Sequence, residues 1–83
     1  MIEKLISNVG DGGKYIFVVN NSSSIISLYL NITEVVARDN ELEVISRESA
    51  FTIINIENVE EEDLGFIITC TDGVEYYFER VGN

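Results

Sequence analysis

Residues 50–81 have the sequence AFTIINIENVEEEDLGFIITCTDGVEYYFERV, and three runs within them have the β-branched and aromatic composition of strands. The runs are Phe51–Ile56, Phe66–Thr71 and Val74–Val81. Asp72-Gly73 separates the last two runs, and Asp-Gly at such a place favours a two-residue hairpin turn. The acids at positions 60–63 separate the first two runs and are too charged to bury. The stretch therefore predicts a three-stranded antiparallel meander with an acidic loop.

The expected turn sets the register of the last hairpin. If Asp72-Gly73 is a two-residue turn, Thr69 pairs with Tyr76 and Ile67 with Phe78 on a core face. The opposite face then carries three large apolar side chains beside Glu75 and Glu79: Phe66, Ile68 and Tyr77. Something must cover such a face, whether an N-terminal helix, closure of the sheet into a barrel, or another chain. These three residues are therefore candidates for an apolar interface.

The first nine residues have the spacing of an amphipathic helix. Apolar side chains recur at i, i+3, i+4 and i+7, and Gly10 follows as a helix-ending residue. We expect a short helix over residues 1–9. Lys14–Val19 then has the nearly continuous apolar composition of a central strand.

A longer strand, or two strands joined by a bend, is expected at Ile25–Ala37. Its apolar residues lie at even positions up to Ile32 and then move to odd positions. Such a phase change predicts a β-bulge or a break in the strand near Asn31 to Glu34. Asp39-Asn40 fits a two-residue turn into the next strand, Glu41–Arg47, which would pair Val35 with Val44 and Ala37 with Leu42.

Length and composition complete the expected fold. We predict a mainly β domain over residues 1–83, with minor α+β character. It would be a small antiparallel sheet or partly closed barrel of five or six strands, with a short N-terminal helix. The apolar fraction of 46% is enough for a core, and one cysteine allows no internal disulfide. No stretch approaches the roughly 20 apolar residues of a membrane span or has the form of a signal peptide, so we expect a cytoplasmic protein.

The residue types argue against catalysis. The chain contains no histidine, so the usual general base near neutral pH is missing, and Cys70 lies inside a predicted strand as an inert thiol. We expect neither an enzyme nor a cofactor. The acids at positions 60–63, with Glu57 nearby, do not reproduce the alternating ligands of a calcium loop. We predict no metal site, although a weak divalent-ion site in the acidic loop stays open.

Charge is the most informative bulk property. Fifteen acids against five bases leave a net charge of −10, which repels nucleic acids and anionic membranes and favours a basic protein partner. The alternative is that the acids only keep the protein soluble. The candidate partner-binding acids are Glu34, Glu41, Glu43, Glu57, Glu60, Glu61, Glu62, Asp63, Glu75 and Glu79.

In size and charge the chain resembles small acidic phage proteins that inhibit host defence nucleases by imitating DNA. That resemblance implies a non-enzymatic inhibitor or adaptor that docks on the basic surface of a nucleic-acid-binding protein. The alternative function is a structural or self-assembling β module, which would bury the apolar face of Phe66, Ile68 and Tyr77 in a homo-oligomer.

Overall fold

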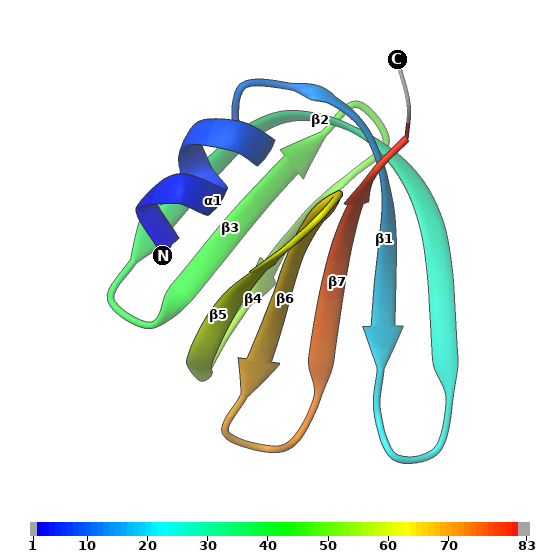
Figure 1. Cartoon of the computed structure of the whole chain (residues 1–83), viewed down its shortest axis with the longest axis vertical. Coiled ribbons are helices and arrows are strands. Elements are labelled where there is room, and N and C mark those ends of the chain that lie inside the picture. Colours follow the sequence, from blue (N-terminus) through cyan, green and yellow to red (C-terminus); the bar gives the residue numbers. More distant parts are fainter. Residues whose placement is uncertain (1, 82–83) are drawn as a thin grey trace.

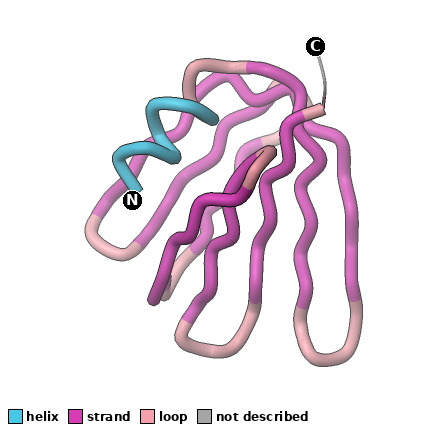
Figure 2. The backbone as a smooth tube through the Cα atoms, viewed as in Figure 1, coloured by secondary structure: helices cyan, strands magenta, loops and turns pink. Residues whose placement is uncertain are grey.

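The computed structural model describes residues 2–81, and within this range the chain forms one helix and seven strands (Figure 1). The elements are α1 (Ile2–Val9), β1 (Gly13–Asn20), β2 (Ile25–Arg38), β3 (Glu41–Ser46), β4 (Ala50–Ile53), β5 (Ile56–Glu62), β6 (Gly65–Cys70) and β7 (Glu75–Arg80). The strands form one antiparallel sheet with the order β4-β3-β2-β1-β7-β6-β5. The sheet is strongly curved but not closed, because β4 and β5 stand at its two ends (Figure 2). The predicted mainly β class is confirmed, with seven strands in place of five or six.

The strand count was wrong because of residues 51–62. The expected run Phe51–Ile56 is divided: β4 ends at Ile53, and Asn55 has a φ of 58°, a left-handed conformation that turns the chain into β5. The expected acidic loop is also wrong, since Glu60, Glu61 and Glu62 belong to β5 and pair with β6. An end strand has one unpaired edge and a solvated outer face, so it accommodates acids without burying them.

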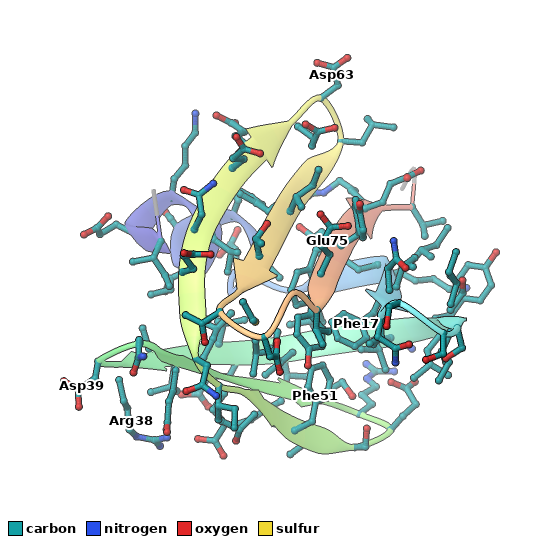
Figure 3. All side chains as sticks on the ribbon, turned by 90° about the horizontal axis from the view of Figure 1, so that it is seen from below. Phe17, Arg38, Asp39, Phe51, Asp63 and Glu75 are labelled. Atoms are coloured by element: carbon teal, nitrogen blue, oxygen red, sulfur yellow. The ribbon has the colours of Figure 1, made fainter. Side chains whose placement is uncertain are left out.

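The core lies on the inner side of the curved sheet. Its largest side chains include Phe17 of β1, whose ring lies 4.6 Å from that of Phe51 and 5.0 Å from that of Phe78, measured between centroids (Figure 3). The other buried apolar residues are Leu5, Val9, Tyr15, Leu30, Ile32, Val35, Leu42, Val44, Ile53, Phe66, Ile68 and Cys70. Strand β5 adds Ile56 and Val59, which are partly buried and pack against this core. One face of every strand thus contributes to a continuous core.

The N-terminal helix covers part of this core. Leu5 and Val9 are fully buried, α1 packs against β2, and Lys4 Nζ lies 2.8 Å from Glu61 Oε1 of β5. The helix ends at Val9 as predicted, and the Gly10 N–H donates to the Ile6 carbonyl at 2.9 Å. The helix therefore lies on the inner side of the sheet, between strands from its two halves.

The β2–β3 hairpin matches the prediction in register and in its irregularity. Val35 pairs with Val44 and Ala37 with Leu42, and the register shifts between Ile32 and Glu34. The bulge lets the inward-facing positions change from even to odd numbers, so both halves of β2 direct apolar side chains into the core.

The β6–β7 hairpin corrects the prediction. Thr69 pairs with Glu75, not with Tyr76, because the connection has three residues. The Gly73 N–H donates to the Cys70 carbonyl and the Cys70 N–H to that of Val74, while Gly73 takes a φ of 89°. A three-residue loop with glycine in the left-handed position reverses the parity of the pairing relative to a two-residue turn. Every side chain of β6 therefore lies on the face opposite to the one expected, while Tyr76 and Phe78 of β7 keep their expected place on the core side.

Candidate functional site

The outer face of β5, β6 and β7 carries acids around two apolar side chains. Glu60 pairs with Ile67, and Ile67 pairs with Tyr77, so these three form one row across the strands. The acidic face, as we use the term, comprises the carboxylates on this side and in the adjacent β5–β6 turn: Glu60, Glu62, Asp63, Glu75 and Glu79.

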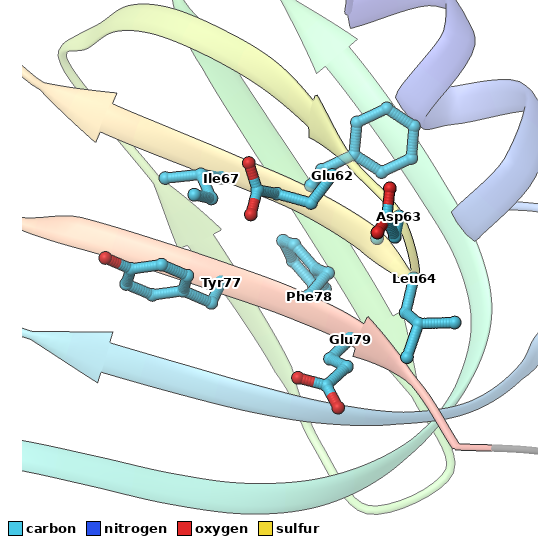
Figure 4. Close-up of a pocket in the computed structure, with 9 residues that line it drawn as sticks. Glu62, Asp63, Leu64, Ile67, Tyr77, Phe78 and Glu79 are labelled. Atoms are coloured by element: carbon cyan, nitrogen blue, oxygen red, sulfur yellow. The ribbon is translucent and has the colours of Figure 1, made fainter.

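A hollow of about 300 Å³ lies within the acidic face (Figure 4). Ile67 and Tyr77 line it from β6 and β7, and Leu64, which is 59% exposed, lines it from the turn. Glu62 and Glu79 stand on either side of it. The hollow thus has apolar walls and carboxylates at its rim.

Gly65 makes room for this hollow. It pairs with Glu62 on one side and Glu79 on the other, so a residue without a side chain separates two acids in the row. A Cβ at this position would overlap the carbonyl oxygen of Phe78. The close approach of the two strands therefore requires glycine, and the hollow is a consequence of that packing.

One acid of this face is held by hydrogen bonds. The Tyr77 hydroxyl donates to Glu75 Oε1 at 3.0 Å, and Asn20 Nδ2 donates to the same oxygen at 3.5 Å. The bond to the carboxylate, with partial burial, raises the pKa of the Tyr77 hydroxyl. Tyr77 is therefore neutral at physiological pH.

The acidic face has no cation of its own in an ion pair. Among the residues that the structure describes, Lys4 pairs with Glu61 and Arg38 with Glu43, and neither pair includes a member of this face. Its carboxylates are available to a cation from outside the chain.

The ten candidate acids do not form one surface. Glu34, Glu41 and Glu43 lie on the outer face of β2 and β3, beside Arg38. Glu57 is exposed at the start of β5, where the register shifts, and Glu61 is directed to Lys4 of α1. In the sheet order, β1 separates β2 and β3 from the strands of the acidic face.

The predicted apolar interface is wrong for two of its three residues. Phe66 is 3% exposed and Ile68 is fully buried, both on the core side of β6, while Tyr77 is on the outer face. The reversed parity of the β6–β7 hairpin explains the error. Reasoning from the sequence also missed Leu64, Gly65 and Ile67. A three-residue Thr71-Asp72-Gly73 loop would have placed Gly65 opposite Glu79 and Ile67 on the outer face.

The described residues include one thiol, and no group of them is arranged to hold a metal ion. Cys70 is buried, and this burial raises the pKa of its thiol, which keeps it protonated. Within residues 2–81 no three carboxylate or thiol side chains gather as a group that could hold a metal ion. No helix in the same range is long and apolar enough to cross a membrane.

Comparison of this chain with protein-family models, with curated proteins and with solved structures finds no match.

Proposed function

We propose that this protein is a non-enzymatic binding module that docks its acidic face on a basic protein partner. The observation that carries the proposal is the apolar hollow with unpaired carboxylates at its rim. An arginine or lysine side chain of the partner would enter the hollow. Proteins that bind nucleic acids display such side chains to neutralise phosphates, so an inhibitor or adaptor acting on one of them fits this surface.

The hollow suits both parts of a long basic side chain. Its aliphatic stem would pack against Ile67 and Tyr77, and its cation would lie between Glu62 and Glu79. A guanidinium could also stack on the ring of Tyr77. Arginine is favoured over lysine because its planar group can bond two carboxylates at once.

Charge alone would give little affinity. An exposed ion pair contributes about 0–1 kcal/mol, so most of the binding energy must come from desolvating the apolar walls around the inserted side chain. The remaining carboxylates would accelerate association and exclude acidic partners. Binding should therefore weaken with salt, since exposed charges are screened over roughly 8 Å at physiological ionic strength.

The test is affinity capture from a cell lysate with the tagged protein, followed by washes of increasing salt and mass spectrometry of each fraction. We expect a basic nucleic-acid-binding protein to be released as the salt rises. The variant E62K/E79K should lose this partner, while the charge-matched control E34K/E41K, on the other group of acids, should retain it. A partner that resists salt, or that both variants lose equally, would contradict the proposal.

A further inference from the structure

The two long edges of β2 are paired to different extents. β2 pairs with β1 from Ile25 to Ile32, but its pairing with β3 covers only Ile32 to Arg38. Residues 25–30 therefore have a neighbouring strand on one side only. Figure 1 shows this part of β2 at the outside of the β1–β2 hairpin, with no strand beyond it.

The direction of the backbone groups along this edge follows from its two ends. At the hairpin loop, the Ser24 carbonyl accepts from the Asn21 N–H and so points toward β1. At the other end, the Asn31 carbonyl accepts from the Arg47 N–H and so points away from β1. Because these directions alternate along a strand, Ile25, Ser27 and Tyr29 point their N–H and C=O groups outward from the free edge.

This edge is also apolar on both of its faces. Exposed fractions are 68% for Ile25 and 63% for Tyr29 on the outer face, and 53% for Ile26 and 49% for Leu28 on the inner face. No residue from Asn20 to Leu30 is charged, in a chain with a net charge of −10. The residues of the segment are thus uncharged and mostly apolar, and the cation beside them is Lys14 of β1, whose Nζ lies 5.4 Å from the centroid of the Tyr29 ring.

The sheet's two end strands have protection that this edge lacks. β5 carries Glu57 and three further glutamates, contains a register shift, and is linked by Glu61 to Lys4 of α1. β4 is only four residues long. Charges, irregularities and short length are the features that prevent strand edges from pairing with other chains, and the β2 segment has none of them.

We propose that residues 25–29 of β2 pair antiparallel with the same segment of a second copy of this chain, about a twofold axis at Ser27. In this register Ser27 faces Ser27, and Ile25 of each copy faces Tyr29 of the other. All three outward N–H groups and all three outward C=O groups of each copy then find partners across the axis. Ile26 faces Leu28 on the inner side, so apolar residues meet on both faces.

Charge favours a second copy over a basic protein at this edge. A basic partner would be drawn to the acidic face, where the carboxylates lie, whereas the neutral edge fits a neutral, apolar strand such as itself. Two molecules of charge −10 repel each other at a distance, so salt should strengthen this contact by screening that repulsion.

The expected dimer is weak. A five-residue segment is about 17 Å long, so pairing along it buries less than the about 800 Å² per partner of a standard stable interface. The dimer should therefore form in a concentration-dependent way and dissociate on dilution.

The first test is sedimentation equilibrium of the intact chain over a wide concentration range, at low and high salt. We expect the mass to rise with concentration from that of one 9.3 kDa chain toward twice this value. At high salt this rise should begin at a lower protein concentration. I25K should weaken the dimer by about tenfold or more, because each copy loses an Ile25–Tyr29 pair. The control I54K replaces an isoleucine that is 52% exposed at the β4–β5 connection and should leave it unchanged. A single-chain mass at every concentration, or equal effects of the two lysines, would overturn the proposal.

The second test addresses the register. S27C should form an intermolecular disulfide under mild oxidation, because directly opposed residues in a hydrogen-bonded pair have Cα atoms about 5.5 Å apart. The control S23C, in the exposed loop between β1 and β2, should cross-link much less. Equal yields would refute the twofold at Ser27. Neither S27C nor I25K alters the acidic face. Both variants should still capture a basic partner, so the dimer can be disproved without disproving the function proposed for the acidic face.

Discussion

Gly65 shows how one residue shapes both the packing and the candidate site. Its absent side chain lets β6 approach β7 closely and leaves the space between Glu62 and Glu79. Gly73 is needed for a different reason, since its φ of 89° is left-handed but open space surrounds it. Gly65 is therefore required for lack of space, and Gly73 is required for its backbone conformation.

Replacing each glycine by alanine should give different losses of stability. G73A should lower the free energy of unfolding by about 1–2 kcal/mol, the cost of a left-handed conformation for a residue with a Cβ. G65A should cost about 3 kcal/mol, because its Cβ would overlap the Phe78 carbonyl and force the strands apart. Urea unfolding of both variants measures the two losses, and we expect the loss for G65A to be the larger. A smaller loss for G65A would show that the strands are not held so closely.

Glu48 binds β2 at the place where the pairing of β2 with β3 ends. Its carboxylate accepts from the Asn31 N–H at 3.0 Å and from Asn31 Nδ2 at 2.8 Å. These hydrogen bonds, the backbone one first, lower the pKa of Glu48 below its ordinary value. A lowered pKa in the folded state means that the ionised carboxylate stabilises the fold at neutral pH. This contribution disappears as the pH falls through the lowered pKa.

E48Q should therefore be less stable than the parent chain at pH 7, and the difference should vanish in strong acid. Unfolding by urea at several pH values measures it. E57Q removes the same charge from another exposed glutamate and controls for the general relief of repulsion in an acidic protein. If E48Q and E57Q behave alike at every pH, the bonds to Asn31 do not contribute to stability.

At the scale of elements, two hairpins explain what the sequence could and could not predict. The β2–β3 register was predictable because Asp39-Asn40 forms a two-residue turn and the apolar alternation on both strands agrees with it. The β6–β7 register was not, because Asp-Gly occurs both in two-residue turns and within three-residue loops. Apolar residues at both parities of β6 left the choice open, and one extra loop residue exchanged the faces.

The helix α1 should matter for stability through its buried face. L5A should lower the free energy of unfolding by about 2–4 kcal/mol, because Leu5 is fully buried among core residues. Ser7 lies on the exposed face of the same helix, so S7A should change the free energy of unfolding by less than about 0.5 kcal/mol. Thermal or urea unfolding compares them. Similar values would mean that α1 does not pack stably on the sheet.

At the scale of the whole molecule, composition gives the net charge but does not tell which acids lie together on one surface. Ten acids were candidates from sequence, and only the folded sheet separates those of β2 and β3 from those around the hollow. The hollow itself has no sequence signal apart from Gly65, since it arises where two strands approach closely. The neutral edge of β2 likewise becomes visible only when the pairing of β3 is known to begin at Ile32.

We propose above that the hollow of the acidic face receives a basic side chain. The most direct measurement is a titration of the ¹⁵N-labelled protein with a short peptide that contains one arginine, followed by amide chemical shifts. A peptide with citrulline in place of arginine has nearly the same shape without the charge and serves as the control.

We predict shifts concentrated at Gly65, Ile67, Tyr77 and Glu79 with the arginine peptide at low salt. These shifts should disappear at high salt and with the citrulline peptide. Shifts that are spread evenly over all acids, or centred on Glu34 and Glu41, would contradict binding in the hollow. Equal shifts for the two peptides would contradict it as well.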